Sequence, residues 1–148
     1  MDNLFERQTA QKFIDRLNRL TPETAAKWGK MNVAQMLRHC QAPLQIASGE
    51  IRFKVNPVIR FLFGKRARKQ ILSEPQFEKN LPTFAKIIDS HIFEEEKNKL
   101  IHFIQKYQEG GKDKLIKEPH PFFGDLSVEE WNALMVKHLD HHLRQFGV

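Results

Sequence analysis

The C-terminal segment contains the feature that most constrains the fold, a long helix whose first turn is encoded locally. Ser127 and Glu130 have the spacing of a capping box, in which each side chain satisfies a free backbone N–H group of the first turn. From there to about Gln145, apolar residues recur at helical spacing without an intervening glycine or proline. The sequence therefore predicts an amphipathic helix over 127–145, whose apolar face other elements must cover.

Apolar residues recur at helical spacing in three further segments, and no segment shows the alternation of a convincing strand. Asn32 is a good N-cap for the second segment, and Gly110 and Gly111 end the third. The connection between the second and third segments is long, which suits a four-helix bundle with one long crossover. We therefore expect an all-α chain that forms one domain over residues 1–148. The expected helices before the C-terminal one cover residues 4–20, 32–49 and 83–109.

Two prolines predict local departures from these helices. Pro43 lies inside the second helix and cannot donate a backbone hydrogen bond to the carbonyl of His39, so we expect a kink or bulge there. Within the long connection, Pro57 favours the first turn of a helix and predicts a short helix with extended flanks. Residues 73–82 and 112–126 are expected to be loops.

The long connection also holds most of the excess positive charge. The chain has 24 lysines and arginines against 18 acids, a net charge of +6, and residues 52–69 contain seven of the bases and no acid. One interpretation is a non-catalytic protein that binds nucleic acid or an anionic surface through this stretch, although no nucleic-acid-binding motif makes nucleic acid an expected partner. The favoured interpretation is a crossover that packs its apolar side on the helices and exposes its charges. The bases are Arg52, Lys54, Arg60, Lys65, Arg66, Lys69 and Arg68.

Several classes of protein are excluded or disfavoured by simple counts. Cys40 is the only cysteine, so an intrachain disulfide is excluded, and we expect it to be a buried, inert thiol. The longest apolar stretches are far shorter than a bilayer span. The N-terminal residues do not resemble a secretory signal. We therefore expect a cytoplasmic protein without a membrane span.

The predicted C-terminal helix places two histidines on its apolar face. At about 100° per residue, His142 lies about 40° from His138 and Gln145 about 20° from it on the other side. His141 lies about 60° away, and Asp140 points well away from this face. Residues one turn apart can bind the same metal ion. Alone this HxxxH spacing is a weak signal, because core histidines paired with polar side chains also show it.

The second predicted helix supplies a third histidine. His39 lies on a face with Met36, beside the distortion expected at Pro43. Metal sites in helical bundles are assembled from inward side chains on facing helices. Three imidazoles leave coordination positions open for water or substrate, an arrangement found in catalytic zinc sites that also suits nickel, iron or cobalt. The sequence therefore favours a metal site formed by His39, His138 and His142.

Three segments resemble the DinB/YfiT-like superfamily, and the resemblance covers nearly the whole chain. They are residues 28–39 (WGKMNVAQMLRH), residues 120–131 with their HPFFG start, and residues 137–147 (KHLDHHLRQFG), which are the most specific. The resemblance implies a four-helix bundle with a long crossover between the second and third helices. Its usual metal triad, one histidine on the second helix and an HxxxH pair on the last, implies the same three histidines and favours His142 over His141.

The resemblance also implies a class of chemistry. Characterised members of the superfamily include transferases and isomerases that use low-molecular-weight thiols, and metal-dependent hydrolases. We therefore expect a metal-dependent enzyme, a thiol-dependent transferase or a hydrolase, whose substrate is a small molecule such as a thiol. We expect zinc or nickel as the divalent transition metal. Because homodimers are common in the superfamily, we also expect a homodimer.

Four further residues are predicted to act around the metal. His120 precedes a proline in a loop and is the best candidate for a general acid or base, with anchoring of that loop as the favoured alternative. Gln35 and Gln145 each lie about one turn from a ligand, and His141 lies beside His142. Each of the three can hold a ligand imidazole or a bound water from outside. A structural role as a partly buried amide is an equal alternative for the two glutamines.

Overall fold

The structure, a computed structural model, describes residues 2–52, 54–73, 76–79, 92–116 and 118–148, and only the backbone of residues 63 and 70–72. In this part of the chain all regular elements are helical and no strand forms, which confirms the predicted all-α fold class. The elements, in chain order, are α1 (Arg7–Asn18), α2 (Val33–Ala47), α3 (Pro57–Ser73), α4 (Phe93–Gly110), the 3-10 turn η1 (Lys112–Lys114) and α5 (Val128–Gln145).

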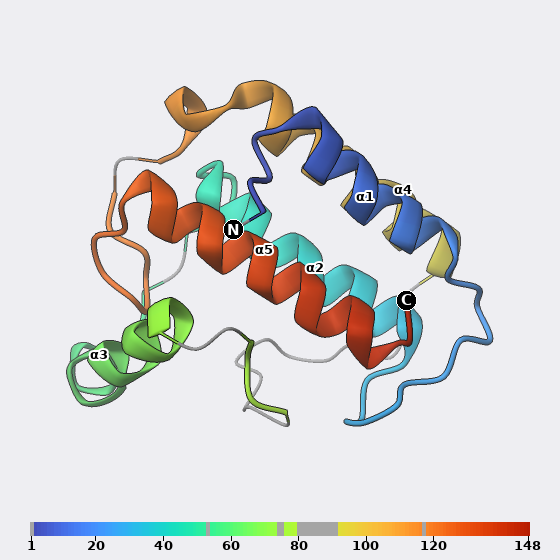
Figure 1. The fold of residues 1–148 in the computed structure, drawn as a ribbon. Coiled ribbons are helices and arrows are strands. Elements are labelled where there is room, and N and C mark those ends of the chain that lie inside the picture. Colours follow the sequence, from blue (N-terminus) through green and yellow to red (C-terminus); the bar gives the residue numbers. More distant parts are fainter. Residues whose placement is uncertain (1, 53, 74–75, 80–91, 117) are drawn as a thin grey trace.

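The main core lies between α1, α2, α4 and α5 (Figure 1). Both α1 and α2 contact α4 and α5, so the apolar faces predicted from the periodicity are buried against one another. Burial of this apolar surface is the main driving force for the packing of these helices. The arrangement places α2, which carries His39, beside α5, which carries His138 and His142. Core side chains that are almost inaccessible to solvent include Leu17, Leu37, Leu100, Met135 and Leu139.

Local sequence determines where two of these helices begin. The Ser127 hydroxyl accepts a hydrogen bond from the Glu130 N–H, and the Glu130 carboxylate accepts one from the Ser127 N–H, which confirms the predicted capping box of α5. Asn32 and Gln35 make the same reciprocal contacts at the start of α2. The helix then continues through Pro43 to Ala47. These caps fix where each helix starts, and therefore which way the histidines further along it point.

Two helices differ from their predicted bounds. The sequence predicts a helix from residue 83, but α4 begins at Phe93, because Ile92 has extended backbone angles (φ −89°, ψ 118°) that interrupt a helix. The predicted residues 83–91 lie outside the described part of the chain. The helix predicted as short does begin at Pro57 but continues for 17 residues to Ser73, because good helix formers follow and no proline interrupts them. The long connection therefore contains a full helix where a short one was predicted.

The additional helix α3 lies beside α5, outside the other helices (Figure 1). Arg68 holds it there, because Nε and Nη2 of its guanidinium donate to the Glu130 carboxylate over 2.7–3.0 Å. Gly64 allows a close approach to the loop before α5, since a Cβ at this position would lie 2.8 Å from the Phe122 carbonyl oxygen. None of the helices in the described ranges has the length and apolar character that crossing a membrane requires.

Candidate metal centre

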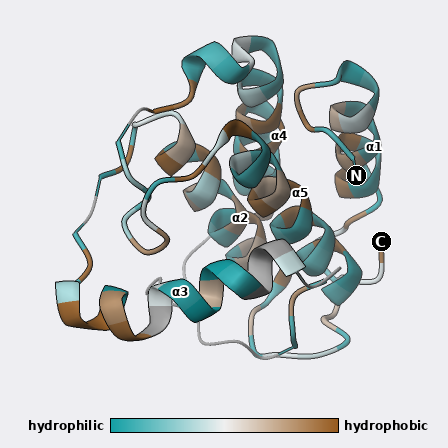
Figure 2. Ribbon diagram, turned by 60° about the vertical axis from the view of Figure 1, so that its left-hand side comes forward, coloured by the Kyte–Doolittle hydropathy of each residue, from teal (hydrophilic) through white to brown (hydrophobic). Residues whose placement is uncertain are grey.

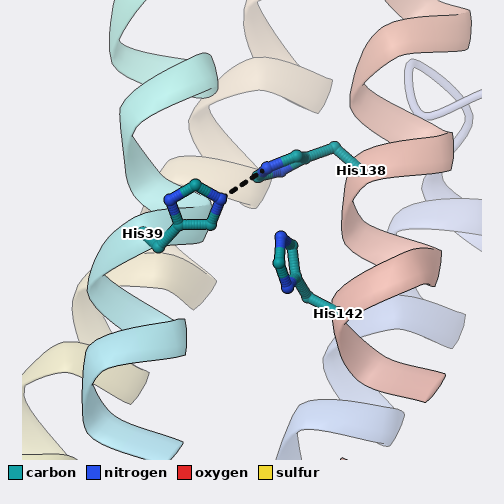
Figure 3. Close-up of side chains that lie close together, drawn as sticks. All are labelled: His39, His138 and His142. Carbon is teal, nitrogen blue, oxygen red and sulfur yellow. Dashed lines mark hydrogen bonds between the residues drawn. The ribbon is translucent and has the colours of Figure 1, made fainter. Parts of the chain in front are cut away.

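His39, His138 and His142 come together between α2 and α5 (Figure 3). His138 and His142 project from successive turns of α5 toward α2, and His39 projects from α2 toward them. His142 is buried, with 7% of its surface exposed, and the other two histidines are partly buried. The three rings therefore have the inward direction that the helical periodicity predicts.

The distances between the three rings are nearly equal. The ring centroids of His39, His138 and His142 are 4.7–4.8 Å apart in each of the three pairs. The Nε2 atoms of His39 and His138 are 2.9 Å apart, and one nitrogen from each histidine lies within 4.8 Å of the others. Two nitrogens bound to one transition metal at about 2.0–2.1 Å lie about 3–4 Å apart. Small rotations of the rings would bring the three nitrogens to these distances, so the residues fit an ion.

The three histidines are held in the neutral state that metal ligands need. Burial is the main cause that lowers the pKa of His39 to about 4 and that of His142 to about 3. Burial also lowers the pKa of His138 well below its usual value, and the neighbouring histidines lower it further. Near neutral pH each ring is therefore neutral and carries one lone pair, so an ion can bind without a net loss of protons. The hydrogen bond between Nε2 of His39 and Nε2 of His138 requires a proton on one of these two nitrogens, and that proton moves to Nδ1 of the same ring when both Nε2 atoms bind an ion.

A chain of hydrogen bonds fixes the orientation of His142. The Gln145 amide nitrogen donates to the Trp28 carbonyl over 2.7 Å, and its amide oxygen is 2.8 Å from Nδ1 of His142. Because a carbonyl only accepts, the NH2 group of Gln145 must face Trp28, and its oxygen must face His142. Nδ1 of His142 is therefore the protonated nitrogen, and Nε2 carries the lone pair. The contact agrees with the prediction that Gln145 holds the His142 imidazole, and Trp28 extends the chain of hydrogen bonds by one further residue. A role of Gln145 toward a metal stays a prediction.

Gly29 makes this chain of hydrogen bonds sterically feasible. It has a φ of +82°, in the region that favours glycine. A Cβ at this position would lie 2.5 Å from the Gln145 amide nitrogen. A larger residue would therefore strain the backbone and also displace the side chain that orients His142.

Further aromatic rings lie against one side of the three histidines. The His141 ring lies 5.0 Å from that of His142, and His141 also donates a hydrogen bond to the backbone of Phe77. Phe77 in turn lies 6.3 Å from His138, and the Lys79 ammonium lies 4.6 Å above the Trp28 ring. No local pattern in the sequence marks Phe77 or Lys79, because only the path of the chain brings residues 76–79 to α5.

The remaining residues near the three histidines have structural partners. The Gln35 side-chain oxygen accepts the Asn32 N–H in the helix cap, so this contact serves α2. Cys40 is buried with its sulfur 3.7 Å from that of Met36, and burial raises its pKa, as expected for an inert thiol. Asp140 turns away from the histidines, as predicted, and pairs with Arg16 at 2.9 Å. Within the described residues, the cluster is therefore formed by imidazoles alone.

His120, predicted as a catalytic acid or base, organises the loop before α5. Its Nδ1 accepts hydrogen bonds from the N–H groups of Phe122 and Phe123 at 3.1 and 3.2 Å, and its backbone pairs with Gly124. The ring stacks on Phe123 and lies 5.3 Å from the Trp131 ring. These contacts agree with the loop-anchoring alternative. The catalytic role stays a prediction.

Acid is expected to weaken this loop through His120. Burial lowers the pKa of His120 from 6.5, its value in the unfolded chain, to about 4. Between these two pH values the unfolded state therefore binds more protons than the folded state. The free energy of unfolding consequently falls as the pH falls from 6.5 toward 4. In a His120→Asn variant, whose amide oxygen can accept the same N–H groups, the loss of unfolding free energy between pH 7 and pH 5 should be smaller by about 2 kcal/mol. Urea unfolding at both pH values measures it.

A His102→Asn variant is the control for this measurement, because His102 is exposed on α4 and should leave the pH dependence unchanged. If the His120→Asn variant showed the same pH dependence of the unfolding free energy as wild type, the folded loop would tolerate a protonated His120, and the prediction would be wrong.

One unsatisfied polar atom belongs to the three-histidine cluster itself. Nδ1 of His39 is buried and has no hydrogen-bond partner among the described residues. A buried polar atom without a partner is costly, and an unplaced water or ion is one explanation for it. Together with the converging nitrogens, it indicates a site built for a ligand. An open cavity of about 520 Å³ lies elsewhere, and Pro57 and Arg60 of α3 line it together with Ile116, Glu118, Pro119 and Pro121. None of the three histidines lines it.

Comparisons with known proteins identify a family and no activity. Residues 5–147 match the family described as "Protein of unknown function (DUF1569)". The searches of curated proteins and of solved structures gave no match. Nothing in these findings ties the chain to the DinB/YfiT-like superfamily that its motifs resemble. Because the family match spans nearly the whole chain, the protein belongs to the DUF1569 family.

Proposed function

We propose that this protein is a metal-dependent enzyme in which His39, His138 and His142 hold one divalent transition-metal ion. The observation that carries the proposal is the convergence of three neutral imidazoles, one from α2 and two from α5, with their nitrogens within 4.8 Å of one another. Gln145 supports it further, because it leaves the ligating nitrogen of His142 free of a proton.

The composition of the site favours catalysis over a purely structural ion. Structural zinc sites are closed by four protein ligands, whereas three ligands leave positions open for water or substrate. Neutral ligands also leave the full positive charge on the ion. Such an ion would act as a Lewis acid and lower the pKa of a water or thiol that it binds. Zinc and nickel are the favoured ions, because imidazole suits both.

The reaction that fits these properties is a thiol-dependent transfer or a hydrolysis on a small molecule. Both need an ion with open positions, and neither needs a carboxylate among the ligands. The proposal includes the superfamily resemblance: a single domain with a DinB-like four-helix bundle, formed by α1, α2, α4 and α5, in a cytoplasmic homodimer. His120 remains the candidate for a general acid or base, and Gln35, His141 and Gln145 are proposed to hold the ligands or a bound water.

Metal content tests this proposal directly. Protein purified without an affinity tag and without added metal should contain about one zinc or nickel ion per chain by elemental analysis. A chelator should remove the ion, and a stoichiometric amount of metal should restore it. Protein that contains no transition metal and takes up none on addition would contradict the proposal.

A further inference from the structure

The first two turns of α3 expose a cluster of large apolar side chains. Val58, Phe61 and Leu62 have the spacing i, i+3 and i+4, so they share one face of the helix, and Ile59 lies beside them. Their exposed fractions are 62% for Val58, 75% for Phe61, 60% for Leu62 and 42% for Ile59. Among the described residues, Ile92 is the one other large apolar side chain as exposed as these. We call these four residues the apolar patch.

Basic residues continue the same face of α3 toward its C-terminus. Lys65 and Lys69 lie seven and eleven residues after Val58, so they project in the same direction, and Arg66 lies beside them. All three are exposed, and none has an ion pair among the described residues, whereas Arg68 is turned inward to Glu130. Figure 2 shows the result, a helix whose first turns are hydrophobic and whose middle is hydrophilic.

We propose that this face of α3 docks the protein on an anionic lipid surface. The apolar patch would enter the boundary between headgroups and acyl chains, while Lys65, Arg66 and Lys69 would contact the anionic headgroups. In such binding, burial of apolar side chains and electrostatic attraction act together. An anionic lipid surface therefore accounts for the presence of both large apolar and basic side chains on one face of α3. No acid between residues 52 and 69 opposes the attraction.

The position of α3 suits a flat partner. The helix lies at the edge of the molecule and its outer face is not enclosed by other described elements (Figure 1). A membrane surface can therefore approach it along its length. The Arg68–Glu130 ion pair fixes the helix to α5, so docking needs no rearrangement of the three-histidine site.

Two other occupants fit the same face less well. A second copy of the chain, related by a two-fold axis, would bring the basic residues of both α3 helices into one interface. These cations would find no acidic partner on the facing α3 helix, so they would repel one another. Nucleic acid would satisfy the cations, but it is contacted mainly through phosphates and polar base edges, so it would leave the apolar patch uncovered. Charge and apolar character together therefore favour the lipid surface.

Vesicle binding by the full chain tests the proposal. Wild-type protein should float with vesicles of phosphatidylserine and phosphatidylcholine at low salt, bind phosphatidylcholine vesicles much less, and dissociate at high salt. A Lys65→Gln/Lys69→Gln variant should bind about 25-fold more weakly, since each cation near an anionic surface contributes about fivefold. A Phe61→Ser/Leu62→Ser variant should bind at least tenfold more weakly.

Matched controls distinguish binding through this face of α3 from non-specific binding through other exposed cations or apolar side chains. Lys112→Gln/Lys114→Gln removes two exposed cations from η1, and Ile92→Ser removes an equally exposed apolar side chain outside α3. Both should bind like wild type, and circular dichroism should show that every variant is folded. Equal binding to neutral vesicles, or wild-type binding by either α3 variant, would overturn the proposal.

Two competing results would also overturn it. One is tight binding of duplex DNA that the Phe61→Ser/Leu62→Ser variant retains, which would indicate nucleic acid. The other is a wild-type dimer that this variant converts to a monomer without any vesicle binding by wild type, which would indicate a second copy. A His39→Ala variant should bind vesicles normally, so these tests do not depend on the proposed metal.

Discussion

Replacing His39 or His142 with alanine is expected to abolish tight binding of a divalent transition metal. Removing a residue that only supports a metal ligand typically weakens affinity 10–100-fold, so loss of a direct ligand should cost more than about 100-fold. His39 is the sole contribution of α2 to the cluster, and His142 is the proposed ligand that Gln145 orients. Competition with a chromogenic chelator measures the affinity of each variant.

Thermal stability gives a second measure of the same effect. Metal at 1,000 times its dissociation constant should stabilise the wild-type protein by about 4 kcal/mol, because it binds the folded state. For a chain of this length, that corresponds to a rise in Tm of about 8–16 °C. The rise should disappear in His39→Ala and in His142→Ala when the same metal concentration is used.

His102 provides the matched control for both measurements. It is exposed on α4 and is not part of the cluster, so His102→Ala should show the wild-type affinity and the wild-type rise in Tm. A rise in Tm that persists in both ligand variants would place the metal elsewhere on the chain, and the three-histidine site would lose its main support.

The sequence predicts those parts of the site that depend on local geometry. His138 and His142 follow from a helix whose start is fixed by the Ser127–Glu130 cap, and periodicity alone places both on the inward face. The choice of His142 over His141 follows from the same angles, and the described cluster contains His142. His39 required one step more, the assumption that α2 and α5 face each other.

Contacts between distant segments could not be predicted in this way. Gln145 reaches the Trp28 carbonyl across 117 residues of sequence, and no local pattern marks a backbone carbonyl as a partner. Phe77 and Lys79 lie in a segment without periodicity, so their approach to His138 and Trp28 depends on the tertiary path of the chain. The environment of the site is therefore the least predictable part of it.

The helix bounds fail for two different physical reasons. The helix α4 begins only at Phe93 because Ile92, a residue type that does not by itself exclude a helix, has an extended conformation. In α3 the apolar and basic residues share the outer face, so the expected segregation of polar and apolar sides is absent and periodicity underestimates the helix. Its length became evident only from the backbone.

Replacing Gln145 with leucine is expected to destabilise the folded protein and weaken the metal site together. The side chain is buried, and its removal leaves the Trp28 carbonyl and the His142 Nδ1–H without partners. Each unsatisfied group costs about 1–3 kcal/mol, so Tm should fall by about 5–15 °C. Metal affinity should fall 10–100-fold, because nothing then holds the orientation and tautomer of His142.

A Gln145→Glu variant separates these two effects. A carboxylate can still accept the His142 Nδ1–H, and carboxylates commonly support metal-bound histidines, so metal affinity should equal or exceed that of wild type. The carboxylate cannot donate to the Trp28 carbonyl, so Tm should still fall. The expected result is therefore a loss of stability without a loss of affinity, measured by melting of the metal-free protein and by chelator competition.

The control is Gln105→Leu, which changes an exposed glutamine on α4 and should affect neither quantity. If Gln145→Glu lowered metal affinity as much as Gln145→Leu, then metal binding would depend on the contact of Gln145 with Trp28 rather than on its contact with His142. The amide of Gln145 would then act by holding the Trp28–Gly29 loop against α5. Equal metal affinity in wild type, Gln145→Leu and Gln145→Glu would show that Gln145 does not support the metal site. Another residue would then have to fix the tautomer of His142.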